Sequence, residues 1–263
     1  MTMNCVQYLG KNVIKFTGTI GIITIFMLNI LISFGDFLKN FKKHLMSTLK
    51  HLYEIGFSSA SIIALIITTT GAVMALQSYI GFNQLQSNFI ILKIVVFSIT
   101  RELGPVLVGL IIAGRSASAI AAEISAMKIS EQIDSLRTLS INIYSYLFLT
   151  RIIASIIALP FLVFIADCFG IMGGTIIAHN VIQVDINSCI NYVIEAFQYK
   201  DFISGIYKAF FFGFIIAFIS CFYGFNCNKG SEGVGEATTK AVVSSFIFIM
   251  IANYILTQLF FNI

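Results

Sequence analysis

The chain has 263 residues, of which 58% are hydrophobic and only 11% carry a charge, and its mean hydropathy is +0.93. This is too little charge to cover a water-soluble globule, so the composition excludes an ordinary soluble enzyme and predicts a polytopic membrane protein. The net charge of +4 is small and the basic residues gather in short segments. That pattern is typical of the positive-inside rule and excludes a nucleic-acid-binding surface.

The five cysteines predict neither a disulfide framework nor a metal site, because they are odd in number, scattered and without metal-ligand spacing. His44 and His51 have no third ligand near them in the sequence. We therefore expect no metal ion and no cofactor.

The first 54 residues predict a membrane-associated segment. Residues 16–35 are apolar with lysines on both flanks, and the run is longer than the hydrophobic region of a usual signal peptide. Because basic flanks favour the cytoplasmic side, we interpret this run as re-entrant or partly interfacial. Residues 36–54 alternate apolar and basic side chains at helical spacing. This predicts a basic interfacial helix, which either lies beside anionic headgroups or recognises a lipid.

Residues 55–263 predict a transmembrane domain of about five helices. The first span, 55–82, carries Gln77 and Tyr79 near its outer end, where such groups more often anchor at the interface than line a cavity. Residues 89–100 are too short to span alone and lead to Pro105. They predict either a long kinked helix or a short outer element.

The later spans are 146–178, 205–226 and 241–261, and the acidic stretch 179–204 is expected outside the membrane. Lys208 lies near the outer end of its span. It is a candidate partner for a lipid phosphate, although a lysine there more often extends its ammonium group to the interface.

Residues 101–139 hold the most informative pattern. A run of about 20 apolar residues follows Arg101 and Glu102, which is enough to cross a bilayer as a helix. Arg115 lies inside this run, where a guanidinium needs a partner, water or a cavity. The sequence leaves open whether Arg115 is paired within the protein or lines a functional cavity. Small residues at every fourth position predict close contact with other helices; they are Gly114, Ser118 and Ala122, and beside them Ala113, Ala117, Ala121 and Ser125.

The loop 123–142 predicts a short amphipathic helix. Ser130 is a candidate N-cap, and acidic residues follow it in the first turn, where negative charge suits the helix dipole. Ile133, Leu136 and Leu139 are expected on one apolar face. Such a helix is either an ordinary interfacial element or one that inserts into a groove of a partner protein.

A glycine-rich loop covers residues 227–240, but neither it nor any other part of the chain contains the phosphate-binding motif G-x-x-x-x-G-K-[ST]. We therefore assign no nucleotide site to this chain.

The stretch RELGPVLVGLIIAGRSASAIAAEISAMKISEQIDSLRTL at 101–139 resembles the MlaE/YrbE-type permease family, the membrane subunits of ABC systems that move phospholipids between bacterial membranes. Three further stretches agree with it: GAVMALQSY at 71–79, GIMGG at 170–174 and SEGVGEATTKAVVSS at 231–245. The likeness covers roughly residues 36–261.

The resemblance implies an all-α, non-catalytic, multi-pass protein of the bacterial inner membrane. It implies a homodimer, a cytoplasmic ABC ATPase as a separate chain and a periplasmic MCE-domain lipid-binding protein, with membrane phospholipid as cargo and outer-membrane lipid asymmetry as the outcome. The candidate residues for ATPase coupling are Glu131, Gln132, Ile133, Asp134 and Arg137. The candidate residues of the lipid cavity are Gln77, Tyr79, Arg101, Glu102, Arg115 and Lys208.

Two departures from the family pattern stand out. Asn142 and Ile143 replace a common Asp-Pro pair, which leaves Asn142 able to form a side-chain turn. Glu236 replaces a common arginine and reverses the charge of the last loop. Two alternatives to phospholipid transport are a membrane scaffold that moves nothing and a permease for a sterol or another apolar cargo.

Overall fold

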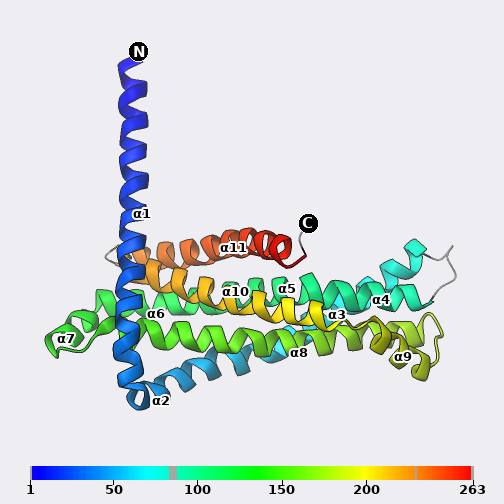
Figure 1. The fold of residues 1–263 in the computed structure, drawn as a ribbon. Coiled ribbons are helices and arrows are strands. Elements are labelled where there is room, and N and C mark those ends of the chain that lie inside the picture. The colour runs from blue at the N-terminus through cyan, green and yellow to red at the C-terminus, as the bar shows by residue number, and fades with distance from the viewer. Residues whose placement is uncertain (1, 83–87, 229, 262–263) are drawn as a thin grey trace.

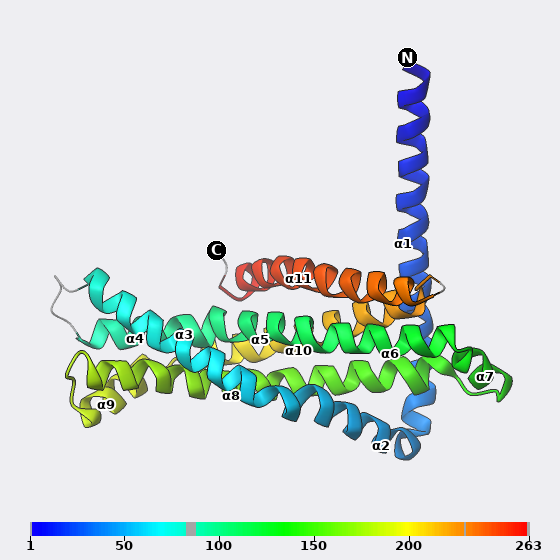
Figure 2. The same ribbon diagram turned by 180° about the vertical axis from the view of Figure 1, so that it is seen from behind.

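A computed structural model describes the backbone of residues 2–82, 88–228 and 230–261, and side chains in these ranges from residue 17 on, except Phe82 and Asn88. Within these ranges every regular element is helical (Figures 1 and 2). Most of the helices lie along one long axis, while the N-terminal helix lies across it. The predicted all-α architecture is confirmed.

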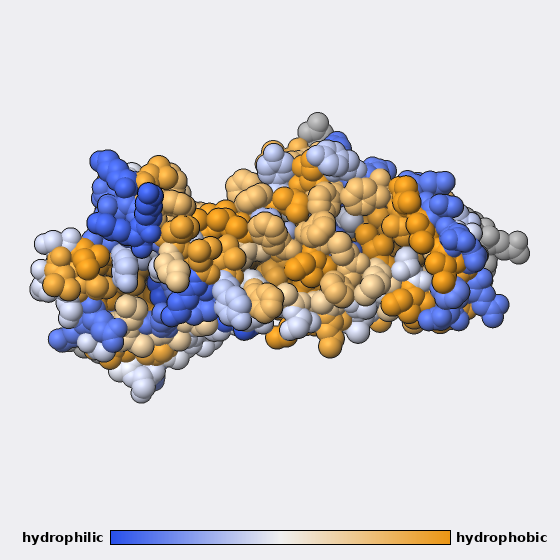
Figure 3. Space-filling view, turned by 90° about the horizontal axis from the view of Figure 1, so that it is seen from below, coloured by the Kyte–Doolittle hydropathy of each residue, from blue (hydrophilic) through white to orange (hydrophobic). Residues whose placement is uncertain are grey.

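Six helical stretches among the described residues are long and apolar enough to cross a membrane. They are Thr17–Lys39, Phe41–Gly81, Phe89–Ile129, Tyr144–Asn180, Tyr199–Phe225 and Ser231–Phe261. The last five correspond to the five predicted spans. Figure 3 shows hydrophobic residues along the middle of one face and hydrophilic residues gathered toward both ends, as expected for a bundle that crosses lipid.

The informative central stretch forms one long helical run made of α4 (Asn88–Ser98), α5 (Gly104–Ile112) and α6 (Ser118–Ile129). Single π-helical turns at Ile99–Leu103 and Ala113–Ala117 join the three helices. Of the two predicted arrangements around Pro105, the structure has the long helix. Proline lacks an N–H, so one backbone hydrogen bond of the helix is missing at Pro105. The wider π-helical turn at Ile99–Leu103 accommodates this interruption without ending the helix.

The centre of the bundle is α8 (Thr150–Asn180), which packs against α3 (Ser58–Phe82) and α10 (Tyr199–Phe225). The contact with α3 is made backbone to backbone. A Cβ at Gly71 would overlap the carbonyl oxygen of Gly170, and a Cβ at Gly173 would overlap that of Thr68. The GIMGG stretch therefore serves close helix packing, which is how membrane helices associate in lipid.

The N-terminal helix α1 (Thr2–Lys39) corrects the sequence prediction in part. Residues 16–35 belong to one uninterrupted helix, so the chain does not dip in and return, and the re-entrant interpretation is wrong. α1 lies across the bundle in Figures 1 and 2. If the bundle axis is the membrane normal, α1 lies along the membrane plane, which is the interfacial alternative. The basic helix α2 (Phe41–Leu52) follows and leads through a π-helical turn into α3.

Two short helices mark opposite ends of the bundle. α7 (Gln132–Thr138) is at one end, and α9 (Ile186–Ala196) is at the other (Figure 1). Basic residues gather at the α7 end on α2, on the end of α6 and on α7 itself, whereas the stretch around α9 is acidic. The positive-inside rule therefore assigns the α7 end to the cytoplasmic side.

Candidate functional site

At the end of the bundle opposite α7, five polar residues of three helices form what we call the outer polar cluster: Arg101, Glu102, Lys208, Asn253 and Thr257. Lys208 Nζ lies 2.9 Å from Glu102 Oε2. From α11 (Ser231–Phe261), Asn253 Nδ2 donates to Glu102 Oε2 at 3.0 Å and Thr257 Oγ1 donates to Glu102 Oε1 at 2.9 Å. One carboxylate thus joins the π-helical turn before α5 to α10 and α11.

Pro105 explains why a lysine is buried here. A helix would pair the Arg101 carbonyl with the N–H of residue 105, which proline does not have. Lys208 Nζ donates to this carbonyl oxygen at 2.9 Å. The Lys208 side chain is fully buried, so its ammonium depends on these two acceptors. Gly205, one turn earlier, lets α10 come this close, because a Cβ there would lie 2.6 Å from the Thr100 carbonyl oxygen.

Arg101 is the basic group of the cluster that reaches furthest outward. Its Nε lies 3.9 Å from Glu102 Oε1, and 15% of its side chain is exposed. Its guanidinium carbon lies 3.3 Å from the ring centre of Phe261 and 5.0 Å from that of Phe97. Stacking on two rings holds the guanidinium in place while leaving part of it accessible.

The structure brings Arg101, Glu102 and Lys208 together but places the other three predicted cavity residues elsewhere. Arg115 is 13 residues further along the same helical run, or about 20 Å away. It donates to Ser59 Oγ at 2.6 Å and Ser58 Oγ at 2.8 Å on α3. It lines a separate crevice of about 290 Å³. Gln77 and Tyr79 lie on the outer end of α3, and no hydrogen bond or ion pair among the described residues joins them to the cluster.

At the other end, α7 exposes most of the predicted coupling residues. Ile133 is buried and fixes the helix to the bundle, whereas Glu131, Gln132, Asp134 and Arg137 are exposed. Asp134 Oδ1 and Arg137 Nη1 pair at 3.4 Å on the surface. α7 therefore offers a polar surface to the cytoplasmic side.

Two local predictions for this loop are wrong. Ser130 does not cap α7; it ends α6 and its hydroxyl donates to the Ala126 carbonyl oxygen, while Glu131 takes the position before α7 with a left-handed φ of 57°. Leu139 does not share the buried face of Ile133, because α7 ends at Thr138 and leaves Leu139 69% exposed. The hydroxyl of a serine inside a continuing helix binds the preceding turn, which removes it as a cap.

The sequence reasoning missed a second buried ion pair. Arg151 of α8 is 3% exposed, and its Nη2 lies 2.8 Å from Glu123 Oε2 on α6. The pair borders a crevice of about 620 Å³ that is also lined by Lys50 and His51 of α2. An arginine and a glutamate one turn inside neighbouring apolar spans are a sequence signal for such a pair. Among the described residues, no group of three metal-ligating side chains occurs.

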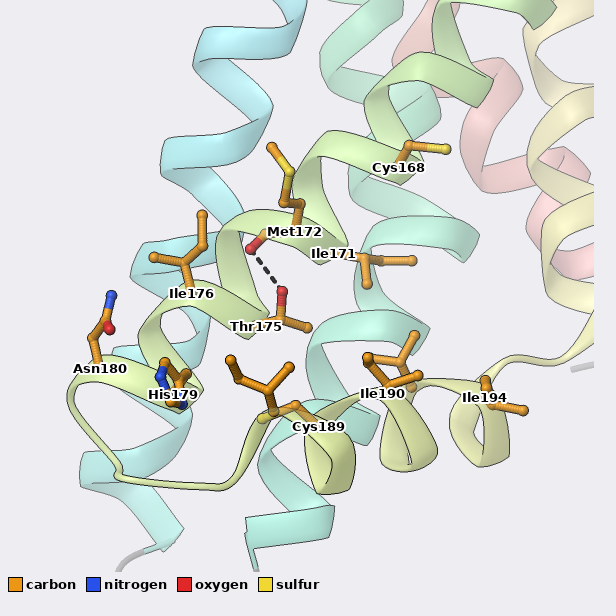
Figure 4. Close-up of a pocket in the computed structure, with 12 residues that line it drawn as sticks. Cys168, Ile171, Met172, Thr175, Ile176, His179, Asn180, Cys189, Ile190 and Ile194 are labelled. Atoms are coloured by element: carbon orange, nitrogen blue, oxygen red, sulfur yellow. Dashed lines mark hydrogen bonds between the residues drawn. The ribbon is translucent and has the colours of Figure 1, made fainter.

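Figure 4 shows an apolar groove between α8 and α9 at the outer end. Its volume is about 460 Å³; His179 and Asn180 lie at one end, and the Thr175 hydroxyl in the wall donates to the Met172 carbonyl oxygen of its own helix. Cys189 is buried beside it; burial, and secondarily the Asp185 carboxylate, raise the pKa of this thiol. The groove wall is therefore uncharged along most of its length.

The fold, the outer polar cluster and the Arg151–Glu123 pair define a class: a multi-pass, all-α membrane protein with ion pairs between its helices and a short exposed helix at one end. The family model described as "Permease MlaE" matches residues 48–259. Over 263 residues the chain is 31% identical to the intermembrane phospholipid transport system permease protein MlaE of Haemophilus influenzae, covering 100% of this chain and 99% of that protein. The chain belongs to the MlaE permease family of ABC transporters.

Two further relatives agree. A probable ABC transporter permease protein of Rickettsia prowazekii is 44% identical over 266 residues, covering 100% of both chains. The Arabidopsis thaliana protein TRIGALACTOSYLDIACYLGLYCEROL 1, chloroplastic, is 36% identical over 221 residues, covering 84% of this chain and 63% of that protein. The chain is thus a membrane-embedded permease of an ABC transporter.

Proposed function

We propose that this permease moves phospholipid between the inner and outer membranes of a bacterium and thereby helps to maintain outer-membrane lipid asymmetry. The support from relatives is the full-length similarity to a permease whose name states intermembrane phospholipid transport. The observation that carries the proposal is the outer polar cluster. It places an arginine whose side chain is partly exposed beside a fixed carboxylate toward the outer end of the bundle.

Within the cluster, we assign different roles to the two basic residues. Arg101 contacts the lipid phosphate, because its planar guanidinium is accessible and suits two phosphate oxygens at once. Lys208 is fully buried and holds Glu102 and the Arg101 carbonyl in place. Gln77, Tyr79 and Arg115 lie away from this cluster and remain proposed cavity residues, which contact lipid at other positions along its path.

The test is lipid analysis by mass spectrometry of the permease reconstituted with its ATPase, with and without ATP. We expect phospholipid to be loaded or extracted only with nucleotide, and Arg101→Ala to reduce this about tenfold, as for loss of one charge-assisted contact. Lys93→Ala, an exposed lysine on the same helical run, is the matched control. Constant lipid occupancy would contradict transport and favour a scaffold, and a sterol in place of phospholipid would contradict the cargo.

We further propose that the permease works as a homodimer. Of the two stripes of small residues on the π-helical turn Ala113–Ala117 and α6, one is fully buried within the chain: Ala113, Ala117, Ala121 and Ser125. The other, Gly114, Ser118 and Ala122, remains partly or fully exposed. Small residues left uncovered at this spacing suit close approach of a second copy in lipid. Ser118→Cys in a variant without other cysteines is expected to form disulfide-linked dimers under oxidising conditions. If only monomer is recovered while the cysteine still reacts with a thiol label, the proposed homodimer contact is contradicted.

The exposed face of α7 is the proposed docking site for a separate ABC ATPase on the cytoplasmic side. We expect Glu131→Lys with Asp134→Lys to abolish ATPase binding and ATP-dependent lipid movement, because two charges at the contact are reversed. Glu195→Lys, an exposed acid on α9, is the control. Unchanged ATPase binding and transport in the double variant would refute the docking role. With α7 on the cytoplasmic side, α9 and the outer loops at the opposite end face a periplasmic MCE-domain protein in this proposal.

We also propose that the protein lies in the bacterial inner membrane. We propose, further, that the chain divides into a membrane-associated segment, residues 1–54, and a permease domain, residues 55–263, with the coupling segment at about 123–142. Tagging each part and fractionating the two membranes tests the location.

A further inference from the structure

The segment that leaves the coupling helix is held by the N-terminal helix. Between α7 and the π-helical turn Tyr144–Leu149 there are only five residues, 139–143. That turn packs against α1. The face of α1 toward it combines buried apolar residues with polar ones at helical spacing: Phe26, Asn29, Ile30, Ser33, Asp36 and Phe37.

Asn142 makes the polar part of this contact. Its Nδ2 lies 3.1 Å from Ser33 Oγ and 3.1 Å from Asp36 Oδ2, both on α1. Its Oδ1 accepts the Tyr144 N–H at 3.0 Å, which is the predicted side-chain turn. One turn away, Asn29 Nδ2 donates to Tyr144 Oη at 3.2 Å. One amide group therefore fixes the exit of the coupling loop and binds α1 at the same time.

The apolar part makes the contact stiff. Phe26 of α1 is 3% exposed, and its ring centre lies 5.1 Å from that of Phe148 and 5.7 Å from that of Phe222. Packed rings of this kind resist sliding, since interiors are close-packed. On the entry side of the loop, Lys128 Nζ donates to the Phe225 carbonyl oxygen at 2.6 Å. The loop is thus tied to α10 where it begins and to α1 where it ends.

From this geometry we propose that Asn142 is a positioning residue that links α7 to α1, so that nucleotide-driven displacement of α7 moves the N-terminal helix. The inference rests on the proposed function, in which an ATPase displaces α7. α1 is then a moving part of the transporter and not a passive membrane anchor. A hydrogen-bonded amide suits this role, because its bonds are directional and keep the two segments in one register.

The experiment uses the full-length permease with its ATPase in liposomes, in a variant whose five cysteines are replaced and whose transport is retained. An environment-sensitive fluorophore is attached at Ile32→Cys, a residue of α1 that is 74% exposed. The variants are Asn142→Ala, Ser33→Ala and the exchange Ser33→Asn with Asn142→Ser, which offers a side-chain hydrogen bond again. Asn180→Ala, an exposed asparagine at the opposite end, is the matched control.

We expect ATP to change the fluorescence of the parent protein. In Asn142→Ala, ATPase binding and hydrolysis continue, the fluorescence change is lost, and the lipid moved per ATP falls about tenfold, as for loss of one or two hydrogen bonds. The exchange variant recovers most of the fluorescence change, which a general loss of folding would not allow. The Asn180→Ala control behaves like the parent.

Two results overturn the inference alone: lipid movement in the parent without a fluorescence change on α1, or a full fluorescence change in Asn142→Ala. A parent complex that hydrolyses ATP and moves no lipid would instead overturn the proposed function, and the inference with it.

Discussion

Two buried ion pairs lie toward opposite ends of this bundle, and they are built differently. In each, the base is almost fully buried and the acid is partly exposed: Lys208 with Glu102 at 2.9 Å, and Arg151 with Glu123 at 2.8 Å. Glu102 also accepts two hydrogen bonds from α11. Glu123 has Arg151 as its only ion-pair partner among the described residues and borders a large open crevice.

The difference concerns what each pair holds together. The inner pair ties α6 to α8, which flank the coupling loop and are already packed in the bundle. The outer pair also binds α11. In the most apolar 18-residue stretch of α11 only 11% is buried, against 56% in the corresponding stretch of Tyr144–Asn180. Although α11 packs against α10 and α6, few of its residues are buried, so the hydrogen bonds from Asn253 and Thr257 add to a packing that covers only one side of the helix. We infer that the inner pair supports helices that are buried in the bundle and that the outer cluster helps to fix the position of a peripheral helix.

The largest expected effect is that of Glu102→Ala. It leaves the Lys208 ammonium buried with a backbone carbonyl as its remaining acceptor, which costs about 3–5 kcal/mol for a broken buried pair. The free energy of unfolding in mixed micelles, followed by far-UV circular dichroism, measures it. Glu195→Ala, at an exposed site on α9, should change it little. A loss no larger than that of the control would show that the outer pair holds nothing.

Glu123→Gln should cost less, about 2 kcal/mol. Arg151 keeps a bond to the Leu147 carbonyl oxygen at 2.8 Å, and water in the crevice can hydrate the neighbouring amide. The same unfolding measurement applies. If this variant lost as much stability as Glu102→Ala, the two pairs would be equivalent and the contrast between them would fail.

Thr257→Val removes one of the two bonds from α11 to Glu102 and keeps the shape of the side chain. We expect a loss of about 1 kcal/mol and faster proteolysis of α11, since one neutral-to-charged hydrogen bond is lost. Thr175→Val, whose hydroxyl bonds within its own helix, is the control. Equal proteolysis of the two variants would mean that α11 is held by packing alone.

The sequence predicted the spans well because their length and composition are set by the lipid, whatever the neighbouring helices do. It could not predict which charges meet. Glu102 and Lys208 are 106 residues apart, and they meet only because of how α10 is placed. The same placement brings Lys208 to the Arg101 carbonyl oxygen, which Pro105 leaves without its helical partner. Asn253 and Thr257 were missed, although two polar residues four apart in an apolar helix mark one face of it.

The N-terminal region is a second case in which the sequence alone left the arrangement undecided. Basic flanks and apolar length favour both a re-entrant and an interfacial arrangement, and the continuous helix Thr2–Lys39 excludes the first. The ring contacts of Phe26 that hold this helix on the bundle are tertiary and cannot be predicted from the flanks. The predicted N-cap of α7 was wrong for a local reason. Ser130 lies between α6 and α7, and its hydroxyl donates to a carbonyl oxygen of α6, which ends there.

A buried carboxylate outside the two pairs gives the smallest expected effect and the sharpest check on the role of partners. Asp167 of α8 is 3% exposed and neither of its side-chain oxygens has a hydrogen-bond partner among the described residues; one oxygen lies against Gly104. A carboxylate without a partner gives the folded state nothing that an amide of the same shape lacks. Asp167→Asn should therefore change the free energy of unfolding by less than about 1 kcal/mol, or raise it. A loss as large as that of Glu102→Ala would mean that buried charge itself, and not its pairing, stabilises this bundle.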